Sequence, residues 1–261
     1  MKKFTIIFLI ALGIIAVNSR CKKETHIAHG KAGDIKWLVT KDNVLIICGK
    51  GECENFARDS LKDANFDFRE ITSVIIEEGI TKIGHEAFWE YMSLKSIIIP
   101  NSVTTIENSA FYGCKSLTSI TLPNSVTTIE NRAFYGCKSL TSITLPNNLT
   151  YLGPESFMNC DSLTSITLPN SVTSINNGVF WNCINLKTVT IGNSVTNIVR
   201  LAFSNCISLI EITCLSPIPP SCYSDAFERV NKSSCILKVP YSSVYYYSNA
   251  PEWNEFNIVG I

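Results

Sequence analysis

Apolar and polar side chains alternate along most of this chain in a pattern that returns at a fixed interval. In one copy of the pattern, Ile120 and Leu122 flank Thr121 and follow Ser119, which is the period-two signature of a strand with one buried face. Pro123 ends this strand, because proline has no N–H to donate to a ladder. The pattern therefore predicts a short strand in every copy.

The second half of the same copy predicts a turn back into the core. Val126 and Ile129 form a second apolar pair, for which we expect a shorter extended stretch. Residues 130–135 are expected to make a single turn of helix or 3-10 helix that carries Phe134 inward. Gly136 then lets the chain bend toward the next strand, since glycine tolerates unusual backbone angles.

The interval is 23 residues, since residues 101–123 recur as 124–146 with the single change of Ser109 to Arg132 (124 − 101 = 23). Two residue types keep this step along the chain: Phe88, Phe111, Phe134, Phe157, Phe180 and Phe203, and Cys114, Cys137, Cys160, Cys183 and Cys206. A fixed period of this size is typical of a solenoid, in which every unit stacks on the next. We predict a β-rich solenoid with one main parallel strand per coil, short turn or 3-10 segments between strands, and a cap at each end.

Seven units are expected between residues 71 and 235, and they start near Ile71, Leu94, Leu117, Leu140, Leu163, Leu186 and Leu209. The last unit is irregular, because prolines interrupt it at 217–220 and Phe227 follows Phe203 by one residue too many (227 − 203 = 24). A unit alone buries too little apolar surface to fold, so stability should come from contacts between neighbouring coils.

Both ends of the array carry sequence that differs from the units. Residues 33–70 are expected to form an N-terminal cap, in which two apolar runs pair as a hairpin around residues 41–43, followed by a short helix or loop over residues 55–67. Residues 236–261 are expected to form the C-terminal cap, with a short tyrosine-rich helix at 241–250. Caps are needed because an open solenoid end exposes unpaired backbone groups and core side chains.

The N-terminal residues 1–21 resemble an export signal of the bacterial lipoprotein type. A short basic head precedes an apolar run over residues 4–17, which is too short for a good membrane span. Cys21 stands where such proteins carry a lipidated cysteine, although Arg20 departs from the small residue that is usual before it. We expect an exported protein, held on the outer membrane or cell surface by a lipid anchor on Cys21, with residues 22–32 as a polar tether. The alternative is ordinary cleavage nearby, which gives a soluble secreted protein.

Composition and charge argue against several classes of function. The chain has 22 basic and 22 acidic residues, so no basic face is expected and nucleic acid is not a predicted partner. No nucleophile–base–acid set and no phosphate-binding glycine loop is recognisable, so we do not expect an enzyme or a cofactor. The cysteines at one-coil spacing form a row rather than a tetrahedron, so we expect core residues and no metal site. A disulfide in or near the caps is an open alternative in an oxidising compartment, among Cys48, Cys53, Cys214, Cys222 and Cys235.

The consensus Leu-x-x-Ile-x-Leu-Pro-x-x-Val-x-x-Ile-x-x-x-Ala-Phe-x-x-Cys resembles the BspA-like leucine-rich repeat family of bacterial surface proteins. The similarity extends over about residues 33–261, because residues 37–51 and the ending around Val239, Trp253 and Phe256 look like the ends of that family. The resemblance implies a curved solenoid, secretion or surface display, and a role in adhesion or in contact with host proteins or glycans. It implies no catalytic residues. The buried polar ladder is cysteine in this chain, whereas the commoner leucine-rich repeat places asparagine there.

Two repeated surfaces are candidate contact sites. The outward strand positions form a hydroxyl-lined sheet face that includes Ser119, Thr121, Ser142, Thr144, Ser165 and Thr167. The residues that follow the core phenylalanines form an aromatic ridge of Trp89, Tyr112, Tyr135, Met158 and Trp181. Solenoids bind partners on extended faces, and aromatic residues often anchor such contacts. The competing interpretations are that serine and threonine merely suit a solvated sheet, and that the ridge half-covers the turn beside the core.

Taken together, these features predict a non-catalytic, surface-displayed module that binds an extracellular protein or glycan through the solenoid. The alternative is a structural or protein–protein scaffold in the cell envelope, which the near-identical central units favour because they lack a distinctive pocket. Binding to matrix or glycans would favour adhesion, and partners that copurify from the same cell would favour the scaffold.

Overall fold

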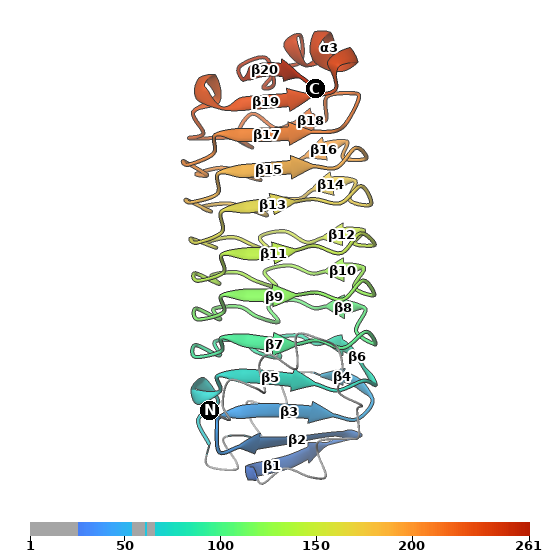
Figure 1. Ribbon diagram of the computed structural model, residues 1–261, viewed down its shortest axis with the longest axis vertical. Coiled ribbons are helices and arrows are strands. Elements are labelled where there is room, and N and C mark those ends of the chain that lie inside the picture. Colours follow the sequence, from blue (N-terminus) through green and yellow to red (C-terminus); the bar gives the residue numbers. More distant parts are fainter. Residues whose placement is uncertain (1–25, 54–60, 62–65) are drawn as a thin grey trace, which may run out of the picture.

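The structure is a computed structural model that describes residues 26–53, residue 61 and residues 66–261. It is a parallel β-solenoid whose coils stack along one long axis, with the first described strands at one end and the C-terminus at the other (Figure 1). The predicted β-rich solenoid is therefore confirmed. The expected export signal with Cys21, and most of the expected helix or loop at residues 55–67, lie outside the described residues.

The main sheet takes one strand from every coil, and neighbouring strands are parallel along the array. β9 (Ser119–Thr121) and β11 (Ser142–Thr144) pair in register at an offset of 23 residues (142 − 119 = 23). β13 (Ser165–Thr167) and β15 (Thr188–Ile191) keep the same offset (188 − 165 = 23). The same sheet direction continues through β5 (Ser73–Ile76), β7 (Ser96–Ile98), β17 (Glu211–Cys214) and β19 (Ile236–Val239).

A second column of mostly shorter strands follows the main strand of each coil (Figure 1). It contains β4 (Gly51–Cys53), β6 (Ile80–Ile83), β8 (Thr105–Ile106), β10 (Thr128–Ile129), β12 (Tyr151–Leu152), β14 (Ser174–Ile175), β16 (Asn197–Ile198) and β18 (Ser221–Cys222). β18 pairs with β16 at an offset of 24 residues (221 − 197 = 24), whereas β17 pairs with β15 at 23 (211 − 188 = 23). The extra residue therefore lies between Cys214 and Ser221, in the segment that the prolines interrupt.

Core phenylalanines stack in one column along the solenoid. Successive rings from Phe88 to Phe227 lie between 5.1 and 5.7 Å apart, centroid to centroid, and are nearly parallel. All of these rings are buried, including Phe227 with its late position in the sequence. Each ring fills the space beneath the next, so a coil is completed only by its neighbours.

The segment expected to form a single turn of helix or 3-10 helix, residues 130–135, forms tight turns, in which Tyr135 donates its N–H to the carbonyl oxygen of Arg132 with the spacing of a 3-10 turn. Arg132 has a left-handed φ of 55°, which interrupts a right-handed helix. Phe134 donates its N–H to the carbonyl oxygen of Ser156 in the next coil, at 2.8 Å. A helix would direct that N–H back along its own chain, so the bond between coils replaces the helical bond. Gly136 bends the chain as expected, with a φ of 68°.

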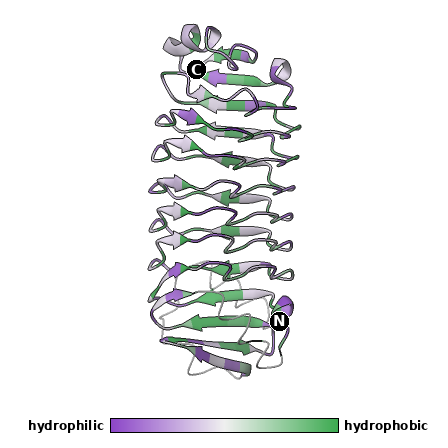
Figure 2. Cartoon of the chain, turned by 180° about the vertical axis from the view of Figure 1, so that it is seen from behind, coloured by the Kyte–Doolittle hydropathy of each residue, from purple (hydrophilic) through white to green (hydrophobic). Residues whose placement is uncertain are grey.

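The N-terminal cap is an antiparallel extension of the main sheet. β2 (Ile35–Thr40) and β3 (Val44–Cys48) form the expected hairpin, and Asn43 in its turn has a left-handed φ of 58°. β1 (His26–Ala32) adds an antiparallel strand to β2, so the expectation of a tether does not hold for residues 26–32. β2, β3 and β5 are apolar along most of their length, whereas β1 is more hydrophilic (Figure 2).

The C-terminal cap closes the core with three aromatic side chains. It is built from η4 (Tyr241–Ser243), α3 (Val244–Ser248) and β20 (Asn257–Gly260), which is parallel to β19. Trp253 and Phe256 contact Phe227 edge-on at 5.7 and 5.2 Å, and Tyr247 contacts Trp253 at 5.4 Å. The expected tyrosine-rich helix is present, as a 3-10 turn followed by a short α-helix.

The cap cysteines do not pair with one another. Cys48 takes part in a disulfide, whereas Cys53, Cys214, Cys222 and Cys235 carry free thiols. The sequence left open a disulfide in or near the caps: Cys48 of the N-terminal cap takes part in one, and no two of these five residues are joined to each other. The 3-10 helices η2 (Phe68–Glu70) and η3 (Lys232–Ser234) lie before and after the regular units.

Candidate functional site

The six hydroxyl residues predicted for the sheet face lie on one exposed surface, here called the hydroxyl grid. In β9, β11 and β13 the middle isoleucine is buried and the two outer residues are exposed. The grid consists of Ser119, Thr121, Ser142, Thr144, Ser165 and Thr167. Its rows repeat at about 4.8 Å between strands and about 6.7 Å along each strand.

Grid hydroxyls make no hydrogen bond to any residue that the structure describes. Threonines on the turns beside the strands behave differently. Thr141 donates its hydroxyl to the carbonyl oxygen of Thr118 at 3.1 Å, and Thr150 donates to Thr127 at 3.2 Å. Those hydroxyls link consecutive coils, so their role is to stabilise the fold. The grid hydroxyls are available to solvent or to a ligand.

The grid changes character at both ends of the sheet. Toward the N-terminal cap, Ile75 and Ile98 take the place of threonine and are partly exposed. Toward the C-terminal cap, Glu211 and Lys238 form an ion pair of 2.8 Å. The centre of the face is therefore neutral and polar, with an apolar margin on one side and a charged margin on the other.

The aromatic ridge is half-buried, and its rings stack on each other. Trp89 and Tyr112 lie 6.2 Å apart with planes 18° from parallel, and Tyr112 and Tyr135 lie 4.6 Å apart at 3°. Burial raises the pKa of Tyr112, and the neighbouring Tyr135 adds to the rise. Because both faces of Tyr112 are covered, its edge and hydroxyl remain for contact with a partner.

The second half of the ridge is less regular. Met158 follows Tyr135 and separates it from Trp181, and both Met158 and Trp181 are partly exposed. No aromatic ring of the described residues stacks on Trp181, and Ser204 in the next coil is buried. The five predicted residues therefore form one continuous edge, in which only the first three rings are stacked.

The cysteine ladder belongs to the core. Cys137 donates its thiol to the carbonyl oxygen of Phe111 at 3.2 Å, and Cys160 donates in the same way to Phe134. Burial raises the pKa of each ladder thiol, to about 12 for Cys206. Protonated thiols are poor nucleophiles and poor metal ligands, so these residues act as small buried donors.

Reactive constellations are sparse in the described part of the chain. Within residues 26–53, 61 and 66–261, no three side chains of the metal-binding types lie close enough to hold an ion. His85 is largely exposed and lies 3.6 Å from Glu86 in the same turn. The same residues contain no helix with the length and hydropathy required to cross a bilayer.

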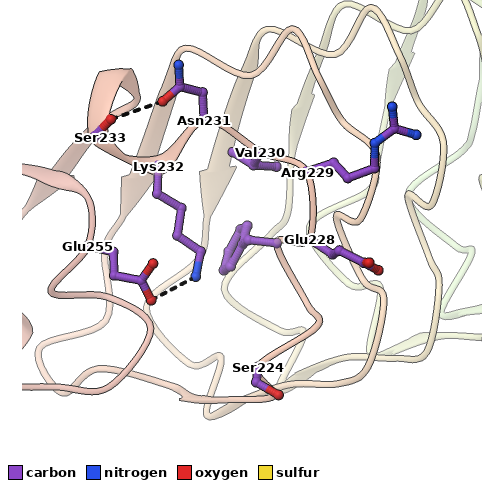
Figure 3. A pocket seen from close by; sticks show the side chains of 9 residues that line it. Ser224, Glu228, Arg229, Val230, Asn231, Lys232, Ser233 and Glu255 are labelled. Atoms are coloured by element: carbon purple, nitrogen blue, oxygen red, sulfur yellow. Dashed lines mark hydrogen bonds and ion pairs between the residues drawn. The ribbon is translucent and has the colours of Figure 1, made fainter.

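A pocket of about 390 Å³ lies beside η3, where sequence reasoning predicted no site (Figure 3). Lys232 enters this region, but its ammonium lies 2.7 Å from Glu252 and 3.1 Å from Glu255. The two carboxylates neutralise the lysine, so it is not free to bind an anion. Its role is to join η3 to the C-terminal cap.

Sequence reasoning also passed over the outward tyrosines of the C-terminal cap. Tyr241, Tyr245 and Tyr246 are 82%, 74% and 59% exposed. The run of tyrosines was visible in the sequence, but it was interpreted as the core of the cap. Only the structure shows which of these rings point inward and which point outward.

Comparison with known proteins identifies the repeats. A family model described as BspA type leucine rich repeat region matches the chain in 6 copies, over residues 59–187 and 150–252. Repeat proteins of this kind generally act by binding other proteins. A search of curated protein sequences finds no match.

Solved structures of bacterial leucine-rich repeat proteins share the fold. The T. pallidum leucine-rich repeat protein is 25% identical, with 72% of this chain and 91% of that chain covered and a TM-score of 0.56. A leucine-rich repeat protein from Bacteroides ovatus is 22% identical, with 88% of this chain and 67% of that chain covered and a TM-score of 0.56.

Proposed function

The chain belongs to the BspA type leucine rich repeat family, and from this premise we propose that it is a non-catalytic module that binds an extracellular protein or glycan. The single observation that carries the proposal is the hydroxyl grid. Its exposed hydroxyls repeat in register and serve no bond within the described fold. A partner with repeating polar groups can therefore satisfy several of them at once.

The aromatic ridge is the second contact surface of this proposal. Its stacked rings are held rigidly, so they lose little conformational entropy when a partner binds. Their covered faces favour edge contacts and hydrogen bonds from the tyrosine hydroxyls over stacking of a sugar on Tyr112 or Tyr135. Protein partners fit these edges better than sugars do.

Display outside the cytoplasm is part of the proposal and rests on the sequence. A basic head, an apolar run and Cys21 resemble a lipoprotein signal, so we place the protein on the outer membrane or cell surface through a lipid anchor. Secretion without the lipid is the alternative form.

The test is an array of extracellular-matrix proteins and glycans probed with the chain and matched variants. Thr121→Val, Thr144→Val and Thr167→Val together remove grid hydroxyls with little change of shape, and Trp89→Ala with Trp181→Ala alters the ridge. Thr150→Val is the control, because its hydroxyl bonds to the neighbouring coil. We expect a hit that the grid triple or the ridge double loses and the control keeps. A hit that both variants keep would refute these surfaces.

A structural scaffold in the cell envelope is the second candidate function. The near-identical units at residues 101–123 and 124–146 favour it, because repetition suits a spacer. An array without hits, together with envelope proteins that copurify from the producing cell, would support the scaffold over the binding module.

A further inference from the structure

The C-terminal cap contains two kinds of aromatic residue with different roles. Tyr247 and Trp253 point inward and are almost fully buried. Tyr247 donates its hydroxyl to Ser216 O at 2.9 Å, and Trp253 donates its ring N–H to Pro220 O at 2.8 Å. These inward residues complete the closure of the core, so the exposed tyrosines of the cap are not needed for it.

The exposed rings lie on ordered backbone, and Tyr245 and Tyr246 contact each other edge to face at 5.9 Å between ring centroids. Tyr241 and Tyr245 lie four residues apart, at the start of η4 and in α3, and no hydrogen bond to another described residue engages their hydroxyls. The backbone beneath them is fixed, since Tyr241 donates its N–H to Ile261 O at 2.9 Å. A β-carbon at Gly260 would lie 2.8 Å from the Tyr241 ring. The absence of a side chain at Gly260 therefore allows the ring to pack against β20.

The segment that carries these rings has no charged side chain. Residues 239–251 contain no acidic or basic side chain, in a chain where 17% of residues are charged. Serines and Asn249 supply uncharged polar groups between the tyrosines. A surface of this kind offers no Coulomb attraction to sulfated or other polyanionic chains.

We propose that the exposed tyrosine face of the C-terminal cap, Tyr241 with Tyr245 and Tyr246, binds neutral polysaccharide. Free ring faces can take the C–H face of a sugar, and phenol and serine hydroxyls can bond to its hydroxyl groups. Neutral sugars match the lack of charged side chains in residues 239–251, and the repeats of a polysaccharide present the same contact many times. The site lies at the end of the solenoid opposite β1, away from the hydroxyl grid and independent of it (Figure 1).

The test is native gel electrophoresis of the full chain through gels that contain laminarin, galactomannan, xylan or soluble starch, with heparin as the charged comparator. Tyr241→Ala with Tyr245→Ala removes two of the three exposed rings, and Tyr241→Phe with Tyr245→Phe keeps these rings without their hydroxyls. Tyr223→Ala is the matched control, because Tyr223 is 55% exposed and lies outside the cap. Circular dichroism confirms that each variant is folded.

At least one neutral polysaccharide should retard the wild-type chain, and the double alanine variant should bind it about tenfold more weakly or worse. The phenylalanine variant should keep most of the affinity, and the control all of it. The proposal is overturned if no neutral polysaccharide binds, if heparin alone binds, or if the double alanine variant binds like wild type. If the variant with Thr121→Val, Thr144→Val and Thr167→Val lost polysaccharide binding and the double alanine variant kept it, the binding site would be the hydroxyl grid and the cap site would be refuted.

Discussion

Alkaline pH should unfold this protein through its cysteine ladder. The ladder thiols are buried, and each donates to a backbone carbonyl: Cys114, Cys137, Cys160, Cys183 and Cys206. Desolvation of the thiolate raises the pKa of every one, to about 12 for Cys206. A thiol in the unfolded chain ionises with a pKa of about 8.5, so above that pH only the unfolded state releases these protons.

The sign and size of the effect follow from proton linkage. Because the folded-state pKa is raised, the stability contributed by each thiol is complete below about pH 8.5 and is lost as pH rises toward the folded-state pKa. At pH 9.5 each thiol lowers the free energy of unfolding by roughly 1 kcal/mol, so the five ladder thiols together lower it by several kcal/mol. This loss is comparable with the whole stability of a typical domain, about 5–15 kcal/mol.

Urea unfolding between pH 7 and 9.5, with a reducing agent present, measures this loss. Cys137→Ala should reduce the pH-dependent loss by the share of one thiol, roughly 1 kcal/mol at pH 9.5. The remaining loss comes from the other ladder thiols and from Cys53, Cys214, Cys222 and Cys235, whose pKa values burial also raises. It should also lower stability at neutral pH by roughly 1–2 kcal/mol, because a buried donor and a sulfur atom are removed. Val126→Ala is the control, since this buried residue does not titrate and should cost the same at every pH. A free energy of unfolding that stays flat to pH 9.5, or an unchanged loss in Cys137→Ala, would refute the reasoning.

Four further substitutions test the packing, each by urea unfolding at neutral pH. Phe134→Ala should cost about 3–5 kcal/mol, because it leaves a cavity between two stacked rings, and a cost below about 1 kcal/mol would contradict the stacked core. Gly136→Ala should cost only about 1–2 kcal/mol, since φ is 68° and a β-carbon meets nothing closer than 3.9 Å. Gly153→Ala should cost more than Gly136→Ala, because its β-carbon would lie 2.6 Å from the backbone of the preceding coil, and equal costs would contradict this contact. Tyr247→Phe should cost about 1 kcal/mol through the lost bond to Ser216, and an unchanged stability would mean that this bond is dispensable.

Periodicity predicted the parts of the fold that repeat. A step of 23 residues is enough to place Ile120 and Ile143 opposite each other in neighbouring strands, and the structure pairs them so. The same step predicted the phenylalanine column, because only residues of one frame can lie above one another in a stack. The hairpin of the N-terminal cap also followed from local sequence, through two apolar runs around a polar turn.

Features that depend on contacts between coils did not follow from the sequence of one unit. A helical turn at residues 130–135 was expected from local composition, yet the N–H of Phe134 bonds to the next coil. The backbone has left-handed φ angles at Glu86, Ser109 and Arg132, and because none of these residues is a glycine, nothing in the sequence indicated them. Residues 26–32 were expected to belong to a tether because the segment is polar and has no apolar pattern. Their pairing with β2 uses backbone atoms, which every sequence provides.

Candidate sites were harder to assess than the fold, because exposure and hydrogen bonding decide them. The ridge residues were predicted as a line, but the stacking that covers both faces of Tyr112 required coordinates. Two classes of threonine look alike in sequence, whereas only one of them bonds to the neighbouring coil. The outward tyrosines of the cap could not be separated from Tyr247 before the direction of each ring was known.

The strand segment is identical in three consecutive copies. Residues 117–123, 140–146 and 163–169 share Leu-Thr-Ser-Ile-Thr-Leu-Pro, although the residues between the last two segments differ from the earlier copies, with Gly153 and Met158 as examples. Leucine, isoleucine and proline in this segment are explained by the core and by the strand end. Its outward serine and threonine have no such explanation, since their hydroxyls make no bond to any described residue. If valine at Thr121, Thr144 and Thr167 left stability unchanged and abolished binding, the identity of these residues would be explained by the partner rather than by the fold.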